Sequence, residues 1–351
     1  MRPESLEEIV RPASKRGIAG TILVALFGFT LANLLAWWIV VSEPSINPGY
    51  AWITAKFNMV RAMEEPVDTL IIGDSSGTIG VNPVVIDRNL GGTSVNLSTI
   101  LQNSILGDPL ILQSYLDKFD PPTRVIVVHT HQAWNTRNLV NALGQMPLAD
   151  ALRHMDSDLL AFDEKLLMLL GRFVPLYVHD LTMPKYLTHP WDSRIVTNPR
   201  SAIDFLTWED PRLRPNGFRP YQPSDAEKVL KKFEGRLKAV SQDFRFSPSA
   251  RAGIARVFEL AAIHEFPVYL VNSPVEEELA ATEEFRRFYA EAREALISVA
   301  VDESYVHVME LDPLVLPASE FFGVNHAAGE AATLYSRWVA ESVLHVEGAQ
   351  E

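Results

Sequence analysis

The sequence predicts an α/β protein: a doubly wound, mostly parallel five-stranded sheet with an N-terminal transmembrane helix and a helical or irregular insertion. Three observations predict this class. Short runs of branched apolar residues recur along the chain, and the first is Leu70-Ile71-Ile72, which is typical of a strand buried on both faces. Amphipathic segments of helical length alternate with these runs in the C-terminal third, as in parallel strands joined by right-handed crossovers. A long uncharged segment precedes all of them.

The composition is that of an ordinary globular protein with an anchor. The chain has 351 residues, of which 47% are hydrophobic and 21% are charged, so there is room for one large, well-filled domain. A net charge of −13 argues against a nucleic-acid partner, because no basic stripe is available to neutralise phosphates. The absence of cysteine excludes disulfides, thiol catalysis and thiolate metal sites.

The N-terminal region is predicted to cross a membrane once. Residues 1–16 form a polar tail, and residues 17–42 then contain no charge, a length sufficient to span a bilayer. A signal peptide would have a shorter apolar region and a small-residue exit, whereas this segment ends in Trp37-Trp38-Ile39-Val40-Val41. Basic residues cluster before the segment, so the positive-inside rule places the N-terminus in the cytoplasm and residues 43–351 outside.

After a connector at 43–66, with a possible short helix at 50–63, the chain carries one predicted domain at 67–345. Its strands are expected at 67–72, 93–98, 124–131, 266–271 and 305–311. Helical periodicity is expected at 84–90, 108–119, 156–170, 225–240, 247–264, 276–300 and 327–344. Asp120-Pro121-Pro122 ends the second of these helices. Between about 132 and 245 the pattern weakens and proline and aromatic residues are frequent, so this part is interpreted as an insertion that forms a lid or a partner surface.

The first candidate site is Gly73-Asp74-Ser75-Ser76-Gly77, directly after the first buried strand. The carboxyl ends of parallel strands are where ligands bind in open α/β sheets. A serine at that edge, followed by a helix N-terminus, lies beside backbone N–H groups that can hold a developing oxyanion. The alternative is a small-residue turn without chemistry, which is common for so short a motif.

The second candidate site is the late histidine. Phe321-Phe322-Gly323-Val324-Asn325-His326 precedes the last predicted helix, and His326 with Ser75 suggests a base and its nucleophile. Such a histidine needs a carboxylate or carbonyl at Nδ1 to fix its tautomer. Glu320 is the preferred candidate because it lies in the same loop, with Asp312 second and Glu310 also open.

Together the two motifs resemble the SGNH/GDSL hydrolase superfamily, which has Gly-Asp-Ser after strand one and Asp-x-x-His before its last helix. The order of the anchor, IIGDSSGTIGVNP, VNLSTI, VIVVHT and the late histidine is similar to the membrane-anchored branch. That branch includes proteins serving D-alanylation of teichoic acids and O-acetylation of alginate. The resemblance implies a periplasmic domain on the bacterial cytoplasmic (inner) membrane and a membrane-bound O-acyltransferase as a partner.

The sequence departs from the family pattern at three blocks. Gly323 stands where the family has its aspartate, Asn96-Leu97-Ser98-Thr99 lacks the usual glycine, and His129-Thr130-His131 begins the segment that replaces Gly-x-Asn-Asp. The resemblance implies that Ser75 and His326 are catalytic. It also implies that Asp74, Asn96 and Asn135 shape the site or the oxyanion hole.

A metal site at His129 and His131 is also conceivable, because alternate strand residues face one side. No acidic or histidine partner lies close in sequence, so no metal is predicted. No phosphate-binding glycine motif occurs either, and no cofactor is predicted.

Two functions from different classes follow. The first is a membrane-anchored, extracytoplasmic SGNH-type hydrolase or O-acyltransferase that acts on acyl esters of an envelope polysaccharide or similar polymer. The second is a catalytically degenerate SGNH-like domain that serves as a structural or assembly subunit of a larger membrane complex.

Overall fold

The computed structural model describes residues 15–42, 48–100, 104–135, 140–154, 159–174, 176, 213–308, 312–323 and 325–348. The chain forms two compact units. One comprises residues 1–47 and 173–207, and the other comprises residues 48–172 and 208–351.

The larger unit is built on a five-stranded sheet in the order β2-β1-β3-β4-β6, and every neighbouring pair is parallel. Its strands are β1 (Thr69–Gly73), β2 (Ser94–Asn96), β3 (Arg124–His129), β4 (Val268–Asn272) and β6 (Val306–Val308). Gly73 pairs with Val128 and His129 with Asn272, so the first candidate motif and His129 reach the same edge of the sheet. The prediction of an α/β fold with a parallel five-stranded sheet is confirmed.

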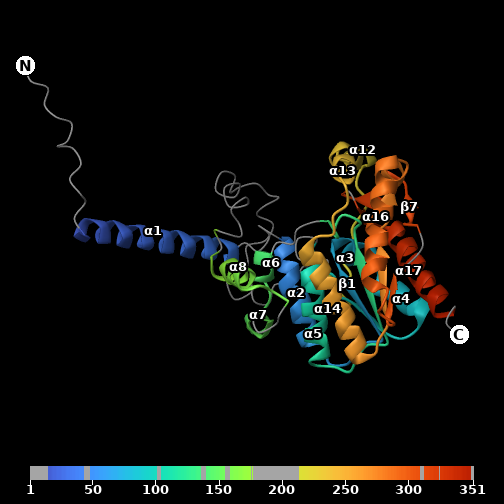
Figure 1. Ribbon diagram of the computed structural model, residues 1–351, viewed down its shortest axis with the longest axis horizontal. Coiled ribbons are helices and arrows are strands. Elements are labelled where there is room, and N and C mark those ends of the chain that lie inside the picture. Colours follow the sequence, from blue (N-terminus) through green and yellow to red (C-terminus); the bar gives the residue numbers. More distant parts are fainter. Residues whose placement is uncertain are drawn as a thin grey trace, which may run out of the picture. The chain divides into compact units, whose positions relative to one another are not determined.

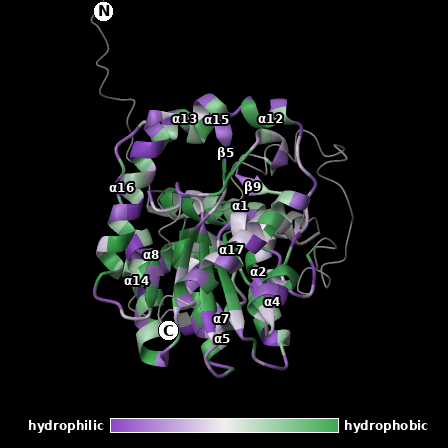
Figure 2. Ribbon diagram, turned by 90° about the vertical axis from the view of Figure 1, so that its right-hand side faces the viewer, coloured by the Kyte–Doolittle hydropathy of each residue, from purple (hydrophilic) through white to green (hydrophobic). Residues whose placement is uncertain are grey.

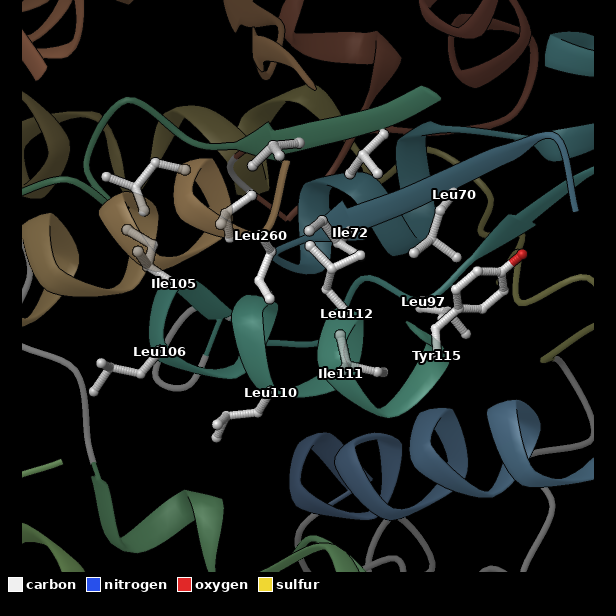
Figure 3. Close-up of a cluster of buried hydrophobic side chains, with 14 of the residues drawn as sticks. Leu70, Ile72, Leu97, Ile105, Leu106, Leu110, Ile111, Leu112, Tyr115 and Leu260 are labelled. Atoms are coloured by element: carbon white, nitrogen blue, oxygen red, sulfur yellow. The ribbon is translucent and has the colours of Figure 1, made fainter. Parts of the chain in front are cut away.

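One face of the sheet is covered by α5 (Ser104–Leu116) and α14 (Pro248–His264), with α2 (Pro48–Ala62) packed outside α5. Alternate strand residues such as Leu70 and Ile72 point to this side. Figure 3 shows them above the apolar residues of α5, from Ile105 to Tyr115. Because β1 and β3 are buried along nearly their whole length, their sequences are apolar runs rather than alternating patterns.

The opposite face is covered by α4 (Pro83–Leu90) and α17 (Glu330–Gly348). Ile71, Ile126 and Val128 point to this side and pack with Tyr335 and Val339 of α17. The sheet therefore lies between two helical layers (Figure 1), and its strands are the most hydrophobic part of the unit (Figure 2).

The smaller unit contains α1 (Lys15–Ser42). Its segment Ile18–Trp38 is long and apolar enough to cross a membrane, and its side chains are exposed except for the half-buried Asn33 and the buried Ala36. A single helix of this kind fits a membrane anchor.

Several elements differ from the sequence prediction. The helix expected at 225–240 is divided into α12 (Ala226–Leu230) and α13 (Phe233–Val240). The helix expected at 276–300 is divided into α15 (Glu277–Ala280) and α16 (Glu283–Ala300), because Thr282 starts a new helix by capping the N–H of Phe285. Inside the connector expected at 43–66, α2 buries Ile53 and Phe57 in the core of the larger unit.

The part read as an insertion is helical in places where it is described, and residues 213–225 are irregular. It contains α6 (Val140–Leu143), α7 (Leu148–His154), α8 (Phe162–Phe173), α12 and α13. Residues 177–212 of the predicted insertion lie outside the described residues. Two further small sheets, which the sequence did not indicate, pair β5 (Val275–Glu276) with β7 (Val315–Leu316) and β8 (Phe321–Phe322) with β9 (His326–Ala327).

Candidate active site

Ser75 is the first residue of α3 (Ser75–Gly80), directly after β1 and the N-cap Asp74. Gly73 makes the turn possible, because its φ is 135° and a Cβ there would lie 1.9 Å from the carbonyl oxygen of Val128. The Asp74 side chain caps α3 by accepting the N–H of Ser76 at 2.8 Å. The strand, the turn and the helix N-terminus expected at this motif are therefore all present.

His326 lies opposite Ser75, although the two residues are separated by 251 positions in the chain. It begins β9, which pairs antiparallel with β8, and Gly323 with φ of 73° lies in the connection between the two strands. The Ser75 Oγ and His326 Nε2 atoms are 2.9 Å apart, which is hydrogen-bond distance for a nucleophile and its base.

The other ring nitrogen of His326 has a backbone partner. Its Nδ1 lies 3.1 Å from the carbonyl oxygen of Phe322. A carbonyl only accepts hydrogen bonds, so Nδ1 carries the proton and Nε2 is left to accept the hydroxyl proton of Ser75. Burial lowers the pKa of His326 below its usual value, so the ring is neutral at pH 7. This is the state that a general base requires.

The partner of Nδ1 is therefore a backbone carbonyl, one of the two kinds of acceptor expected, and not the preferred Glu320. Glu320 is the last residue of the 3₁₀ turn Ala318–Glu320, where it is half-buried. Its backbone oxygen accepts the N–H of Ala328, but its carboxylate forms no ion pair or hydrogen bond with His326 within the described residues. Asp312 is exposed, and Glu310 lies outside the described residues.

Asn96 shapes the site instead of offering a free donor. Its Nδ2 donates to the carbonyl oxygens of Gly77 and Val81, each at 2.8 Å, and its Oδ1 accepts the N–H of Ser98 at 3.0 Å. Both amide protons are thus used to hold α3 against the end of β2. The half-buried Asn135 lies in the turn after β3, and its N–H donates to Gln132. Within the described part of the chain, no hydrogen bond joins Asn135 to Ser75 or His326.

Behind Ser75 lies a buried cluster that the sequence did not indicate, formed by Asp74, His129 and Asp108. His129 Nε2 is 2.7 Å from Asp108 Oδ2, and His129 Nδ1 is 3.8 Å from Asp74 Oδ2. Burial alone favours neutral groups, but the charges of Asp108 and Asp74 outweigh it and raise the pKa of His129 to about 9. Burial also opposes the charge of Asp74, yet His129, the Ser76 hydroxyl and the Thr130 N–H lower the pKa of Asp74 to about 2.

The two histidines considered as a metal pair have different surroundings. The His129 ring is hydrogen-bonded to Asp108, whereas the His131 ring lies edge-on to Phe285 with centroids 4.9 Å apart. Burial lowers the pKa of His131 to about 4. Within the described residues, no group of three or more His, Asp or Glu side chains is arranged to hold a metal ion.

A second buried contact supports the edge of the site. Lys56 of α2 has no exposed surface, and its Nζ donates to the carbonyl oxygens of Asn96 and Gly217, each at 2.6 Å. Burial lowers the pKa of this lysine well below its usual value. Lys56 therefore ties α2 and the segment at Gly217 to the end of β2, next to the residue that holds α3.

No protein-family model matches the chain, and no curated protein matches it.

Proposed function

We propose that the protein is a membrane-anchored serine acyl-ester hydrolase or O-acyltransferase of SGNH type, acting outside the membrane on an envelope polysaccharide or similar polymer. The observation that carries this proposal is the pair Ser75 and His326, with Oγ and Nε2 2.9 Å apart at the carboxyl edge of a parallel sheet. A neutral histidine whose other nitrogen is fixed by a carbonyl is a base ready to accept the serine proton.

The reaction would proceed in two acyl-transfer steps. Ser75 Oγ attacks the ester carbonyl while His326 Nε2 takes its proton, and the tetrahedral oxyanion is stabilised by the Ser75 N–H at the start of α3. His326 then protonates the leaving alcohol, which gives an acyl-serine. Water or a polymer hydroxyl, deprotonated by His326, attacks this acyl group, and His326 returns the proton to Ser75 Oγ as the acyl–serine bond breaks. The choice between water and a hydroxyl decides between hydrolase and transferase.

The test uses the full chain in detergent with p-nitrophenyl acetate as the probe. We expect a burst of p-nitrophenol and an acetyl group on Ser75 in the peptide mass spectrum, and both should disappear in Ser75→Ala. Ser298→Ala is the matched control, because it removes an exposed hydroxyl from α16. Equal acetylation of the wild-type and Ser75→Ala proteins would contradict the proposal.

A second candidate function, a structural subunit of a membrane complex, is supported by α8. This helix exposes Phe162 by 85% and Leu166 by 50%, while Arg172 is turned inward to donate to the carbonyl oxygen of Met146 at 2.8 Å. Large apolar side chains exposed on a helix that already buries Met168 suit a contact with another protein. A stable multi-subunit complex that isolates equally well with Ser75→Ala, and has no acyl-serine, would favour this function over the enzyme.

A further inference from the structure

The Asp74 carboxylate belongs to the N-cap residue that directly precedes the proposed nucleophile in the chain. This carboxylate is fully buried and accepts three hydrogen bonds, from the Ser76 N–H and hydroxyl at Oδ1 and from the Thr130 N–H at Oδ2. A carboxylate that accepts this many donors remains ionised even when buried.

His129 and Asp108 form a hydrogen-bonded pair beside Asp74, with Nε2 and Oδ2 2.7 Å apart. As imidazolium and carboxylate, or as neutral imidazole and carboxylic acid, this pair has no net charge. In either form the negative charge of the cluster is that of the Asp74 carboxylate. His129 is held in place by the edge-on ring of Trp134, with centroids 4.8 Å apart, and by the Ser273 N–H on its backbone oxygen.

Acyl transfer through Ser75 converts His326 to an imidazolium, and an acid beside the ring stabilises that cation in a serine triad. Here Nδ1 is bonded to the Phe322 carbonyl, which is polar but carries no net charge. Asp74 is the residue before Ser75, and Ser75 touches the ring. We propose that the Asp74 carboxylate is the counter-charge of the His326 imidazolium, and that Asp108 and His129 are positioning residues that keep it in place. This inference rests on the proposed function.

The charges that face His326 agree with this role. Against the effect of burial, Asp74 raises the pKa of His326, and the Phe322 carbonyl acts in the same direction. Lys232, exposed between α12 and α13, lowers the pKa of His326. Glu320, in the 3₁₀ turn before β8, makes no ion pair with the ring.

The test measures the protonation of His326 directly. The full chain is labelled with ¹⁵N-histidine in detergent micelles, and the imidazole signals are followed against pH by NMR. The His326 signal is identified among the nine histidines by its loss in His326→Gln. Asp74→Asn removes the charge and Asp74→Ser is the second neutral variant, because serine is also a preferred N-cap. Asp68→Asn is the matched control. Asp68 directly precedes the first residue of β1, at the end of the strand away from Ser75, and its carboxylate accepts the Thr93 N–H.

We expect both Asp74 variants to lower the midpoint of the His326 titration by at least about 0.5 pH unit, as loss of a nearby opposite charge does. Asp68→Asn should leave the midpoint unchanged. With p-nitrophenyl acetate, the Asp74 variants should lose about tenfold or more in kcat with little change in KM, because the missing charge acts on the transition state.

An unchanged or raised midpoint in either folded Asp74 variant would overturn the inference, even if the wild-type protein is active. If Asp74→Asn does not fold, Asp74→Ser decides. A lowered midpoint in a protein without any acyl-serine would contradict the proposed function and leave the electrostatic relation intact. The two failures are thus distinguishable.

Discussion

The ring of Tyr221 stacks on the ring of Phe322, with centroids 4.0 Å apart and an interplanar angle of 26°. Phe322 carries the carbonyl that holds His326 Nδ1. The Tyr221 backbone oxygen also accepts the N–H of Gly329, just beyond β9. Tyr221 therefore supports both sides of the hairpin that presents the proposed base.

Tyr221→Leu should lower kcat about tenfold, because the stack that fixes the Phe322 carbonyl is lost and the His326 ring turns more freely.

Glu320→Gln should change kcat by no more than about twofold, whereas loss of an orienting carboxylate costs about 10⁴ in kcat. Steady-state kinetics with p-nitrophenyl acetate measure both variants. A large loss in Glu320→Gln alone would show that the carboxylate, and not the carbonyl, orients His326.

Stability at mildly acidic pH is expected to depend on His131. The folded protein holds this ring neutral with a pKa of about 4, whereas the unfolded chain protonates it near pH 6.5. As the pH falls through this window the unfolded state takes up a proton that the folded state does not, so the free energy of unfolding falls, by about 3 kcal/mol in total.

His131→Phe should remove this part of the pH dependence, because a phenyl ring does not titrate and His131 already contacts Phe285. Urea unfolding of both proteins at pH 7, 6, 5 and 4 measures the difference. His345→Gln, an exposed change on α17, serves as the control. Parallel curves for the wild-type protein and His131→Phe would refute the assignment.

Residues 213–221 support the end of β2, so a substitution at Gly217 is expected to destabilise the fold strongly. Its φ is +83°, and a Cβ there would lie 1.8 Å from the carbonyl oxygen of Asn96. Gly217→Ala should therefore lower the free energy of unfolding by more than about 2 kcal/mol. Gly235→Ala in α13, where nothing lies within 4 Å of the new Cβ, should raise it by up to about 1 kcal/mol. Equal effects of the two changes in urea unfolding would contradict this packing.

The large features of the fold were predictable because they rest on repeated side-chain patterns. Buried apolar runs identified β1 and β3, and small residues identified the turn before Ser75. The two-residue strands β8 and β9 are too short for any period to show. They are fixed by packing and by Gly323, and they decide where His326 lies.

The surroundings of the proposed dyad were less predictable for a physical reason. The acceptor for His326 Nδ1 is a backbone oxygen, and every residue has one, so no sequence pattern distinguishes Phe322. Asp108 and His129 are 21 positions apart and meet only because α5 packs against the central sheet. The sequence pattern pairs His129 with His131 on one face of a strand. It cannot show that Asp108 of α5 lies beside His129, because a strand pattern does not indicate which helix covers that face.

The orientation of α1 gives the last prediction, and the chain is well suited to test it because it contains no cysteine. Basic residues precede the apolar segment Ile18–Trp38, so the positive-inside rule places the N-terminal tail in the cytoplasm and the larger unit outside. A cysteine at position 298, introduced as Ser298→Cys on the exposed face of α16, should react with a membrane-impermeant maleimide in intact spheroplasts. A cysteine introduced as Ser5→Cys in the tail should react only after the membrane is permeabilised. Labelling of position 5 alone in intact spheroplasts would reverse the topology, and a substrate in the cell envelope would then be ruled out.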